Sequence, residues 1–469
     1  MRFCHVLVAA LAVSIPSLTQ TPSVAPAPKP AHRATAAKAQ FAASPYMGWS
    51  SWSLFRDHPT EEIIKAQADA LVANKLSDLG YRYVNIDDGW TDGFDEHGIP
   101  KPNLTRFPSG MDGMAKYMHQ HGLRFGIYLN PGITAALLKQ NPQIAGTAAH
   151  IADITDTTQA GSTRRNSFRI DFTKPAAVAY IRSQVAQFDR WGIDFIKFDF
   201  VGPGGGNLPA DNREELRQWH AALSHASHPI WLELSNFLSI DQAPLWRATS
   251  NGWRIENDIE CYGCDKATDS TKGNLTNWSK VVGRFSDVVR WLPFNGPDGN
   301  GGSGWNDLDT LELGNGDRDG LTPDERQSMF TLWAISCAPL YFGSDLTMMD
   351  AADLALISNH EIIAIDQAGI PAHPLDIQHL RGKQQQAWLT TYRDGSAVLA
   401  LFNLDNATAT VKLSWHEVDS LRDTHFADGA TPPTLHDLIS GADVAGQADG
   451  LSVSLDSHAS RIFRIPARH

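Results

Sequence analysis

The sequence predicts an α/β fold in which a (β/α)8 barrel precedes a small antiparallel β-sandwich. Two observations support this. Apolar strand-like runs alternate with amphipathic helical patterns about eight times over residues 41–371, which is typical of a closed parallel barrel. From residue 372 to residue 469 the pattern changes to short runs with a period of two, separated by turns, which indicates antiparallel strands.

The first forty residues stand apart from both predicted domains. Arg2 precedes an apolar run at residues 6–13, which is too short to span a membrane, so residues 1–20 are predicted to be a secretory signal peptide. Residues 21–40 are rich in Ala and Pro and are predicted to be a linker. We therefore expect a secreted or periplasmic protein.

Charge and cysteine content narrow the possible partners. Removing residues 1–40 removes four basic and no acidic residues, so the net charge changes from −13 to about −17. An acidic surface repels nucleic acid and anionic lipid, so neither nucleic acid nor a membrane surface is expected as a partner. The sequence does not predict an oligomeric state. Of the remaining cysteines, Cys261 and Cys264 could at most pair locally, and Cys337 is expected to be a buried thiol.

The elements of the barrel follow in chain order. Thr60 is predicted to cap the first long helix, which should end at Gly80. Pro175 should begin another helix and Gly192 should end it. The expected strands are at residues 46–52, 83–90, 124–130, 195–200, 230–236, 253–258, 304–309 and 338–343. In the second domain, strands are expected at residues 387–392, 397–402 and 451–455.

The strand at residues 195–200 carries Lys197 and Asp199 two residues apart, and therefore on one face. A buried charge needs a partner, so one interpretation is a structural ion pair between these two side chains. The other strands also end in polar residues, and barrel enzymes hold their active sites at that end. The candidate site residues are Trp49, Asp87, Asp88, Tyr128, Lys197, Asp199, Asn236, Arg254, Asp258 and Asp309.

This set of side chains suits the binding and cleavage of a sugar. Carboxylates, amides and basic groups can hold hydroxyls, aromatic rings can stack on a sugar ring, and glycosidic cleavage needs one ionised and one protonated carboxyl group. The expected partner is therefore a carbohydrate substrate. Lys197 and Arg254 should keep Asp199 ionised, and Asp199 should raise the pKa of a neighbouring acid such as Asp258. Glu256 and Glu260 compete with Asp258 for the acid role.

Six ordered motifs resemble the signatures of glycoside hydrolase family 27, the α-galactosidase family. They are Met47-Gly48-Trp49, Asn85-Ile86-Asp87-Asp88-Gly89-Trp90, Phe125-Gly126-Ile127-Tyr128, Ile196-Lys197-Phe198-Asp199, Arg254 with Asp258, and Trp305-Asn306-Asp307-Leu308-Asp309.

The resemblance implies a retaining α-galactosidase with Asp199 as nucleophile and Asp258 as acid/base. It assigns the sugar 4- and 6-hydroxyls to the aspartate pair 87–88, the 3-hydroxyl to Lys197 and the 2-hydroxyl side to Arg254. It also implies that Trp49 and Tyr128 wall the pocket, that the segment around Asn236 contacts the 2-position, and that the two carboxyl groups lie about 5 to 6 Å apart. Glu233 and Asp309 are expected to hold neighbouring groups more than to react.

The chain also departs from the family pattern. Gly89 and the Phe200-Val201 pair stand where the family usually has cysteines, and Ser235-Asn236-Phe237 differs at the segment near the 2-position. Alternative activities are therefore those of an isomalto-dextranase, a β-L-arabinopyranosidase or an α-N-acetylgalactosaminidase. A carbohydrate-binding protein without turnover is the alternative from another class.

No cofactor and no metal are expected. Residues 315–320 match the first half of a calcium loop, but the twelfth position is Arg326 rather than Glu.

Overall fold

The computed structural model describes residues 41–263, 273–297, 303–375, 384–419 and 432–467. The predicted signal peptide, the linker and Cys264 lie outside this part of the chain. Within it, none of the helices has the length and apolar character needed to cross a lipid bilayer.

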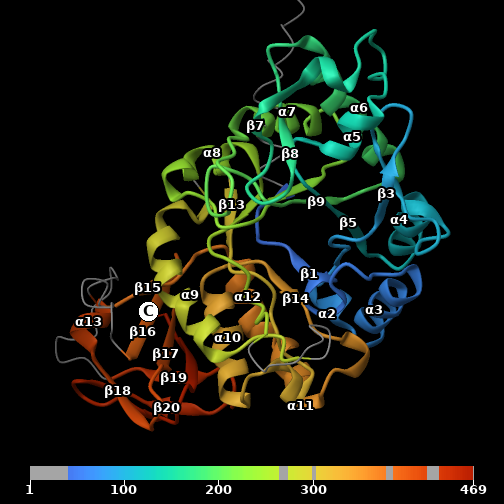
Figure 1. Ribbon diagram of the computed structural model, residues 1–469. Coiled ribbons are helices and arrows are strands. Elements are labelled where there is room, and N and C mark those ends of the chain that lie inside the picture. The colour runs from blue at the N-terminus through green and yellow to red at the C-terminus, as the bar shows by residue number, and fades with distance from the viewer. Residues whose placement is uncertain (1–40, 264–272, 298–302, 376–383, 420–431, 468–469) are drawn as a thin grey trace, which may run out of the picture.

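A curled sheet of eight parallel strands, with the short antiparallel strand β12 (Gly296–Pro297) beside β13, forms the centre of the first domain (Figure 1). The strands neighbour one another in chain order, and β14 also pairs with β1 through Met47 and Leu340. Leu311, just beyond β13, bridges in parallel to Phe342 of β14 and so joins the two ends of the sheet. The strands are β1 (Met47–Ser50), β2 (Tyr83–Asn85), β5 (Arg124–Leu129), β9 (Phe195–Phe198), β10 (Trp231–Leu234), β11 (Gly252–Arg254), β13 (Ser303–Asp307) and β14 (Leu340–Phe342).

Helices connect these strands and cover the outside of the sheet (Figure 1). They are α2 (Trp52–Phe55), α3 (Glu61–Ala73), α4 (Gly110–Gln120), α5 (Ala135–Gln140), α6 (Pro175–Trp191), α7 (Arg213–Leu223), α8 (Ala243–Thr249), α9 (Trp278–Trp291), α10 (Pro323–Ile335), α11 (Ala351–Ile357) and α12 (His360–Gln367).

Local signals set several helix ends as the sequence predicts. The Thr60 hydroxyl accepts a hydrogen bond from the Ile63 amide at the start of α3. Helix α6 begins at Pro175, and Gly192 ends it with a φ of 78°. The prediction that α3 runs on to Gly80 is wrong. The helix ends at Ala73 because Lys75 adopts a left-handed φ of 59°, and Gly80 instead ends a following 3₁₀ turn, Leu76–Leu79.

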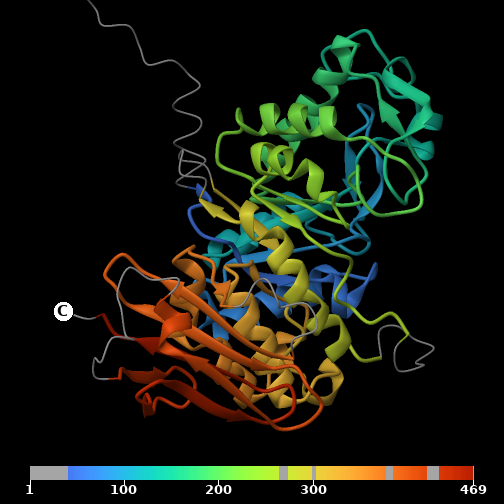
Figure 2. The same cartoon turned by 90° about the vertical axis from the view of Figure 1, so that its left-hand side faces the viewer.

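Two additions lie on the side of the barrel away from the C-terminal domain (Figures 1 and 2). One is the hairpin of β3 (Thr91–Phe94) and β4 (Pro100–Pro102). The other is a three-stranded sheet in the order β6, β8, β7 between β5 and α6. Its strands are β6 (Ile133–Thr134), β7 (Thr155–Ala160) and β8 (Ser167–Ile170).

The second domain is antiparallel, so the predicted fold class is confirmed (Figure 2). A six-stranded sheet packs on a two-stranded one around a separate apolar core. Phe285 of α9 contacts Phe402 with ring centroids 4.9 Å apart, which joins this domain to the barrel. The first sheet contains β15 (His373–Pro374), β16 (Gln385–Thr391), β17 (Ala397–Asn403), β22 (Ser460–Ile465), β19 (Thr434–Asp437) and β20 (Asp443–Ala445), and the second contains β18 (Ala409–Ser414) and β21 (Gly450–Leu455).

Candidate active site

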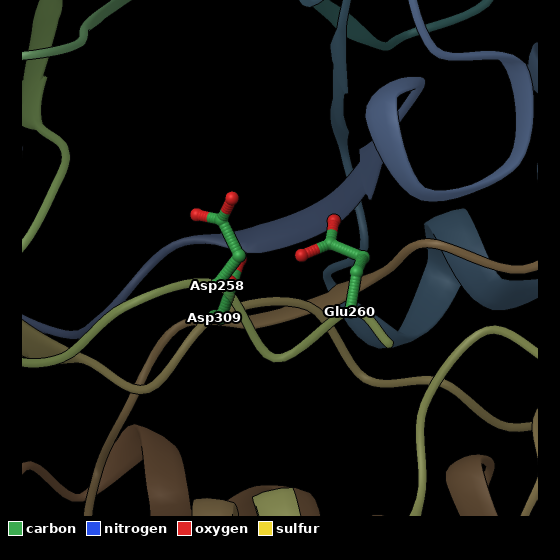
Figure 3. A group of neighbouring side chains, drawn as sticks. All are labelled: Asp258, Glu260 and Asp309. Atoms are coloured by element: carbon green, nitrogen blue, oxygen red, sulfur yellow. The ribbon is translucent and has the colours of Figure 1, made fainter. Parts of the chain in front are cut away.

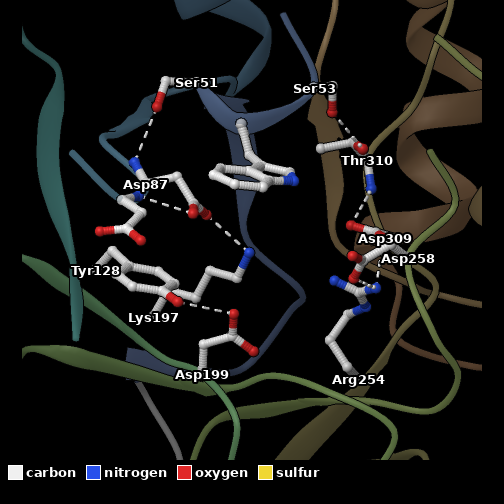
Figure 4. A network of polar contacts seen from close by, with 12 residues as sticks. Ser51, Ser53, Asp87, Tyr128, Lys197, Asp199, Arg254, Asp258, Asp309 and Thr310 are labelled. Carbon is white, nitrogen blue, oxygen red and sulfur yellow. Dashed lines mark hydrogen bonds and ion pairs between the residues drawn. The ribbon is translucent and has the colours of Figure 1, made fainter. Parts of the chain in front are cut away.

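The carboxyl ends of the barrel strands carry two linked groups of side chains on either side of a common space (Figure 4). Asp199 lies on one side, directly after β9, and Asp258 lies on the other, in the loop that follows β11. The strand expected at residues 253–258 is wrong in its extent, because β11 ends at Arg254. Alternation along a strand therefore says nothing about where Asp258 points.

Asp199 is partly exposed, and its carboxyl group accepts two hydrogen bonds. The Tyr128 hydroxyl donates to Asp199 Oδ2 over 3.1 Å, and the Phe200 amide donates to Oδ1 over 2.7 Å. The parallel register pairs Tyr128 with Lys197, so β5 and β9 deliver the tyrosine and the aspartate to the same place. The two donors fix the orientation of this carboxyl group, and a nucleophile must be held in a fixed orientation.

Lys197 forms its ion pair with Asp87, and not with Asp199 as the structural interpretation of the strand supposed. Its ammonium lies 2.7 Å from Asp87 Oδ2. Burial by itself lowers the pKa of Lys197, but the charges of Asp87 and Asp199 outweigh it and raise that pKa above the ordinary value. The lysine is therefore a fixed positive charge beside the expected nucleophile, and its ion pair reaches across β5 to Asp87, which follows β2.

The two aspartates that follow β2, Asp87 and Asp88, have different surroundings. Asp87 is buried, its backbone amide donates to the Ser51 hydroxyl, and burial raises its pKa despite the Lys197 charge. Asp88 is partly exposed; the Gly89 amide donates to its Oδ1, and the guanidinium of Arg165 contacts its Oδ2.

Arg254 links Asp258 to a buried carboxylate. Its Nη2 lies 3.1 Å from Asp258 Oδ1 and also contacts Asp309 Oδ2. The Ile259 amide donates to the same Asp309 oxygen, over 2.8 Å. Asp309 therefore holds the arginine and the loop in place, which matches its expected supporting role.

The expected upward shift of the Asp258 pKa is wrong for the free site. Burial does raise this pKa, but Arg254, Lys197 and a hydrogen bond from Tyr262 together lower it below the ordinary value. The competing Glu260 behaves in the opposite way. It is buried, accepts from the Ser53 hydroxyl over 2.8 Å, and has a pKa raised by burial and by the charges of Asp309 and Asp258.

Oxygen atoms of Asp258, Glu260 and Asp309 lie within 4.8 Å of one another (Figure 3). Carboxylates packed this closely share protons or need a positive charge between them. The Arg254 guanidinium supplies that charge, because it contacts two of the three groups.

Comparison with protein families adds evidence that the geometry alone does not contain. A sequence model described as α-galactosidase A matches residues 44–141 and 169–368, and one described as the α-galactosidase C-terminal β-sandwich domain matches residues 382–465. The chain belongs to glycoside hydrolase family 27, the α-galactosidase family. The family assignment expected from the six motifs is thereby confirmed.

Three members of the family illustrate the similarity. An α-galactosidase of Cyamopsis tetragonoloba is 28% identical over 431 residues, covering 91% of this chain and 87% of that one. Alpha-galactosidase 3 of Arabidopsis thaliana is 30% identical over 427 residues, covering 90% and 82%. The crystal structure of a β-L-arabinopyranosidase from Geobacillus stearothermophilus, in complex with arabinose, superposes with a TM-score of 0.79 at 27% identity, covering 92% and 99%.

In this family 27 chain, Trp49 and Asn236 are buried, as are the predicted site residues Asp87, Tyr128, Arg254 and Asp309. Trp49 has no exposed surface, and its indole N–H donates to the Ser344 carbonyl over 2.8 Å. Asn236 is buried, and its amide nitrogen donates to the Thr163 hydroxyl and to the Gly205 carbonyl. Contact of either side chain with a sugar stays a prediction.

Two residues near the site were missed at the sequence level. The Tyr262 hydroxyl donates to Asp258 Oδ2 over 2.9 Å and accepts from the Trp52 indole over 2.7 Å. Arg165 reaches Asp88 from between β7 and β8. Neither position has a local signal, because both lie in irregular loops and Arg165 is 77 residues from its partner.

The remaining predictions concern the surroundings of the site. Glu233 is buried in the barrel, where it accepts from the Trp231 indole over 2.8 Å. In the calcium-like loop, Asp319 accepts from the Gly314 and Asn315 amides, and Arg326 lies 2.8 Å from Asp353. Cys337 is a buried free thiol, and Cys261 is in a disulfide.

Proposed function

We propose that this family 27 glycosidase is a secreted or periplasmic retaining exo-enzyme that releases terminal α-D-galactosyl residues. The observation that supports it most is the placement of Asp199 and Asp258 on the two sides of one polar space that also holds Lys197 and Arg254 (Figure 4). A retaining mechanism needs two carboxyl groups that approach one sugar from opposite sides.

In the first step a carboxylate oxygen of Asp199 attacks the anomeric carbon. The bond from that carbon to the leaving oxygen breaks, and Asp258 donates a proton to the oxygen as it leaves. In the second step Asp258, now ionised, takes a proton from a water molecule, whose oxygen displaces Asp199 from the anomeric carbon. The Tyr128 hydroxyl stabilises Asp199 as an anion before attack and after release.

The lowered pKa of Asp258 suits the second step, in which this carboxylate acts as a base. The first step needs its proton, and Arg254 and Lys197 disfavour the protonated form. We therefore expect the reaction of poor leaving groups to become faster as the pH falls, because more of the enzyme then carries the proton.

The sugar would be held by the groups around these two acids. Asp87 and Lys197 form a buried pair that can accept from and donate to neighbouring ring hydroxyls, and Arg254 can donate on the acid/base side. The proposal assigns the 4- and 6-hydroxyls to Asp87 and Asp88, the 3-hydroxyl to Lys197, and the 2-hydroxyl side to Arg254.

The test is the configuration of the first product. In ¹H NMR during hydrolysis of p-nitrophenyl α-D-galactopyranoside, we expect α-galactose to appear before its β-anomer forms by mutarotation. Initial release of β-galactose would exclude retention. Binding of galactose without hydrolysis would favour a carbohydrate-binding protein instead.

A second candidate activity is that of a β-L-arabinopyranosidase, favoured by the high structural similarity to the Geobacillus enzyme. The two glycosides share the arrangement of ring hydroxyls, but the arabinoside lacks the hydroxymethyl group at C5. Comparing kcat/KM for the two p-nitrophenyl glycosides decides between the activities.

A further inference from the structure

The segment between the two matched parts of the barrel, residues 142–168, is not covered by the family's sequence model. It contains β7 and the turn that leads to β8. This turn, residues 161–166, lies next to the candidate active site. Its backbone and side chains form hydrogen bonds with residues that follow β9 and β10.

Several hydrogen bonds hold the turn in place. The Thr163 amide donates to the Phe200 carbonyl over 2.9 Å, next to the expected nucleophile. The Asn236 amide nitrogen donates to the Thr163 hydroxyl over 2.6 Å, and the Asn212 amide nitrogen donates to the Gly161 carbonyl over 2.8 Å. Ser162 and Thr163 have almost no exposed surface. The turn is therefore a fixed part of the site.

Arg165 extends from this turn to Asp88. Its Nη2 contacts Asp88 Oδ2, and its guanidinium lies 5.4 Å from the centre of the Phe200 ring. The side chain is 45% exposed, so part of it remains open to solvent. Arg164 lies over the same ring, at 5.9 Å, but makes no ion pair with the described residues.

The contact between Arg165 and Asp88 leaves hydrogen-bonding capacity on both groups. A guanidinium has five N–H donors, and a carboxylate can accept about four hydrogen bonds, of which the Gly89 amide and Arg165 use two. A donor and an acceptor held side by side match a hydroxyl group, which is itself both. A sugar ring with only a hydrogen at the same position would gain nothing from either group.

We propose that Arg165 is a specificity-determining residue that, together with Asp88, forms a two-point site for the hydroxyl of the hydroxymethyl group on C5 of the glycone. This inference rests on the proposed function, because it places the C5 substituent beside Asp88. It goes beyond that function in assigning a second recognition residue to a segment outside the family model.

The experiment compares Arg165→Met with the wild type on p-nitrophenyl α-D-galactopyranoside and p-nitrophenyl β-L-arabinopyranoside. Loss of a hydrogen bond from a charged donor should lower kcat/KM for the galactoside by about ten- to a hundredfold. The arabinoside should change by less than about twofold, since it has no partner for Arg165. Arg164→Met, which changes the neighbouring charge without touching Asp88, should leave the ratio of the two rates unchanged.

The proposal is overturned if Arg165→Met raises kcat/KM for the galactoside or leaves the ratio of the two substrates unchanged. If Arg165 closes the space for the hydroxymethyl group, Arg165→Met will raise the galactoside rate, and an unchanged ratio will show a purely structural role. Arg165→Lys, which keeps a cationic donor on a slightly shorter side chain, should recover part of the ratio. Asp88→Asn combined with Arg165→Met should cost less than the sum of the two single changes.

Measurements on the wild-type enzyme distinguish a failure of the proposed function from a failure of the Arg165 proposal. If the wild type hydrolyses neither glycoside, the proposed function is wrong, and calorimetric titration with galactose and L-arabinose then decides the role of Arg165. A preference for galactose that Arg165→Met removes supports the two-point site; equal binding of both sugars overturns it. Thermal unfolding of each variant shows whether it is folded.

Discussion

The two sides of the active site are built in different ways. On the β9 side, Lys197 and Asp199 lie on or directly after a regular strand. Tyr128 comes from the adjacent strand β5 in register, and Asp87 follows β2, the strand beyond β5. On the β11 side, Asp258 lies in a loop, and Arg254, Asp309 and Tyr262 hold it by side-chain contacts. The comparison teaches that the sheet positions the proposed nucleophile, Asp199, whereas ionic and hydrogen-bonding side chains position the proposed acid/base, Asp258.

The largest expected effect is on the β9 side. Asp199→Ala removes the group that would form the bond to the sugar, so kcat should fall by about four orders of magnitude or more. Circular dichroism and thermal unfolding should show a folded protein, because Asp199 is partly exposed and lies beyond the strand. A variant with more than a tenth of the wild-type kcat would remove Asp199 from the mechanism.

On the β11 side, the effect should depend on the leaving group. Asp258→Ala removes the proposed proton donor, so hydrolysis of an unactivated galactosyl oligosaccharide should slow by about 10² to 10⁴-fold. The first step with a nitrophenyl glycoside, whose leaving group needs little protonation, should slow much less. Steady-state kinetics and the pre-steady-state release of nitrophenol separate the two cases. Equal losses on both substrates would contradict the acid role.

A smaller effect is expected from Tyr262, which together with Arg254 and Lys197 lowers the pKa of Asp258. The Tyr262 hydroxyl stabilises the ionised carboxylate, so Tyr262→Phe should raise that pKa. More Asp258 then carries its proton at a given pH, and activity on a poor leaving group should extend to higher pH by up to about one unit. The pH profile of kcat/KM measures this shift, and Trp52→Phe, which leaves the Tyr262 hydroxyl in place, is the matched control. If the pH profile of Tyr262→Phe does not shift, Tyr262 does not set the pKa of Asp258 and has only a packing role in the loop.

The smallest expected effect concerns the pH dependence of stability at Glu215, a buried residue that has no role in the proposed reaction. Burial raises the pKa of Glu215 in α7 to about 7, although the Gly132 amide and Asn212 donate to its carboxyl group. The fold therefore favours the protonated form. This stabilisation is complete below the unfolded pKa of about 4.3 and is lost as the pH rises through about 7. Glu215→Gln should reduce the fall in Tm between pH 5 and pH 8 by a few degrees. An unaltered fall would show that Glu215 is ionised in the folded protein.

Much of the fold follows from local patterns. Thr60, Pro175 and Gly192 act on the backbone beside them, so the helix ends that they set could be predicted. The end of α3 could not, because a left-handed turn at Lys75 has no strong sequence signal. The extent of β11 was wrong for a similar reason: an alternating run of residues does not show where the hydrogen bonds to a neighbouring strand stop.

The sequence by itself determined the family, the class of fold and the candidate acids, because strand periodicity and short ordered motifs are properties of neighbouring residues. Only the tertiary structure decided the partners. Lys197 pairs with Asp87 across 110 residues, and Arg165 reaches Asp88 from a segment outside the family pattern. It also decided the direction of the Asp258 pKa, because electrostatic interactions depend on distance in space and on burial, neither of which can be read along the chain.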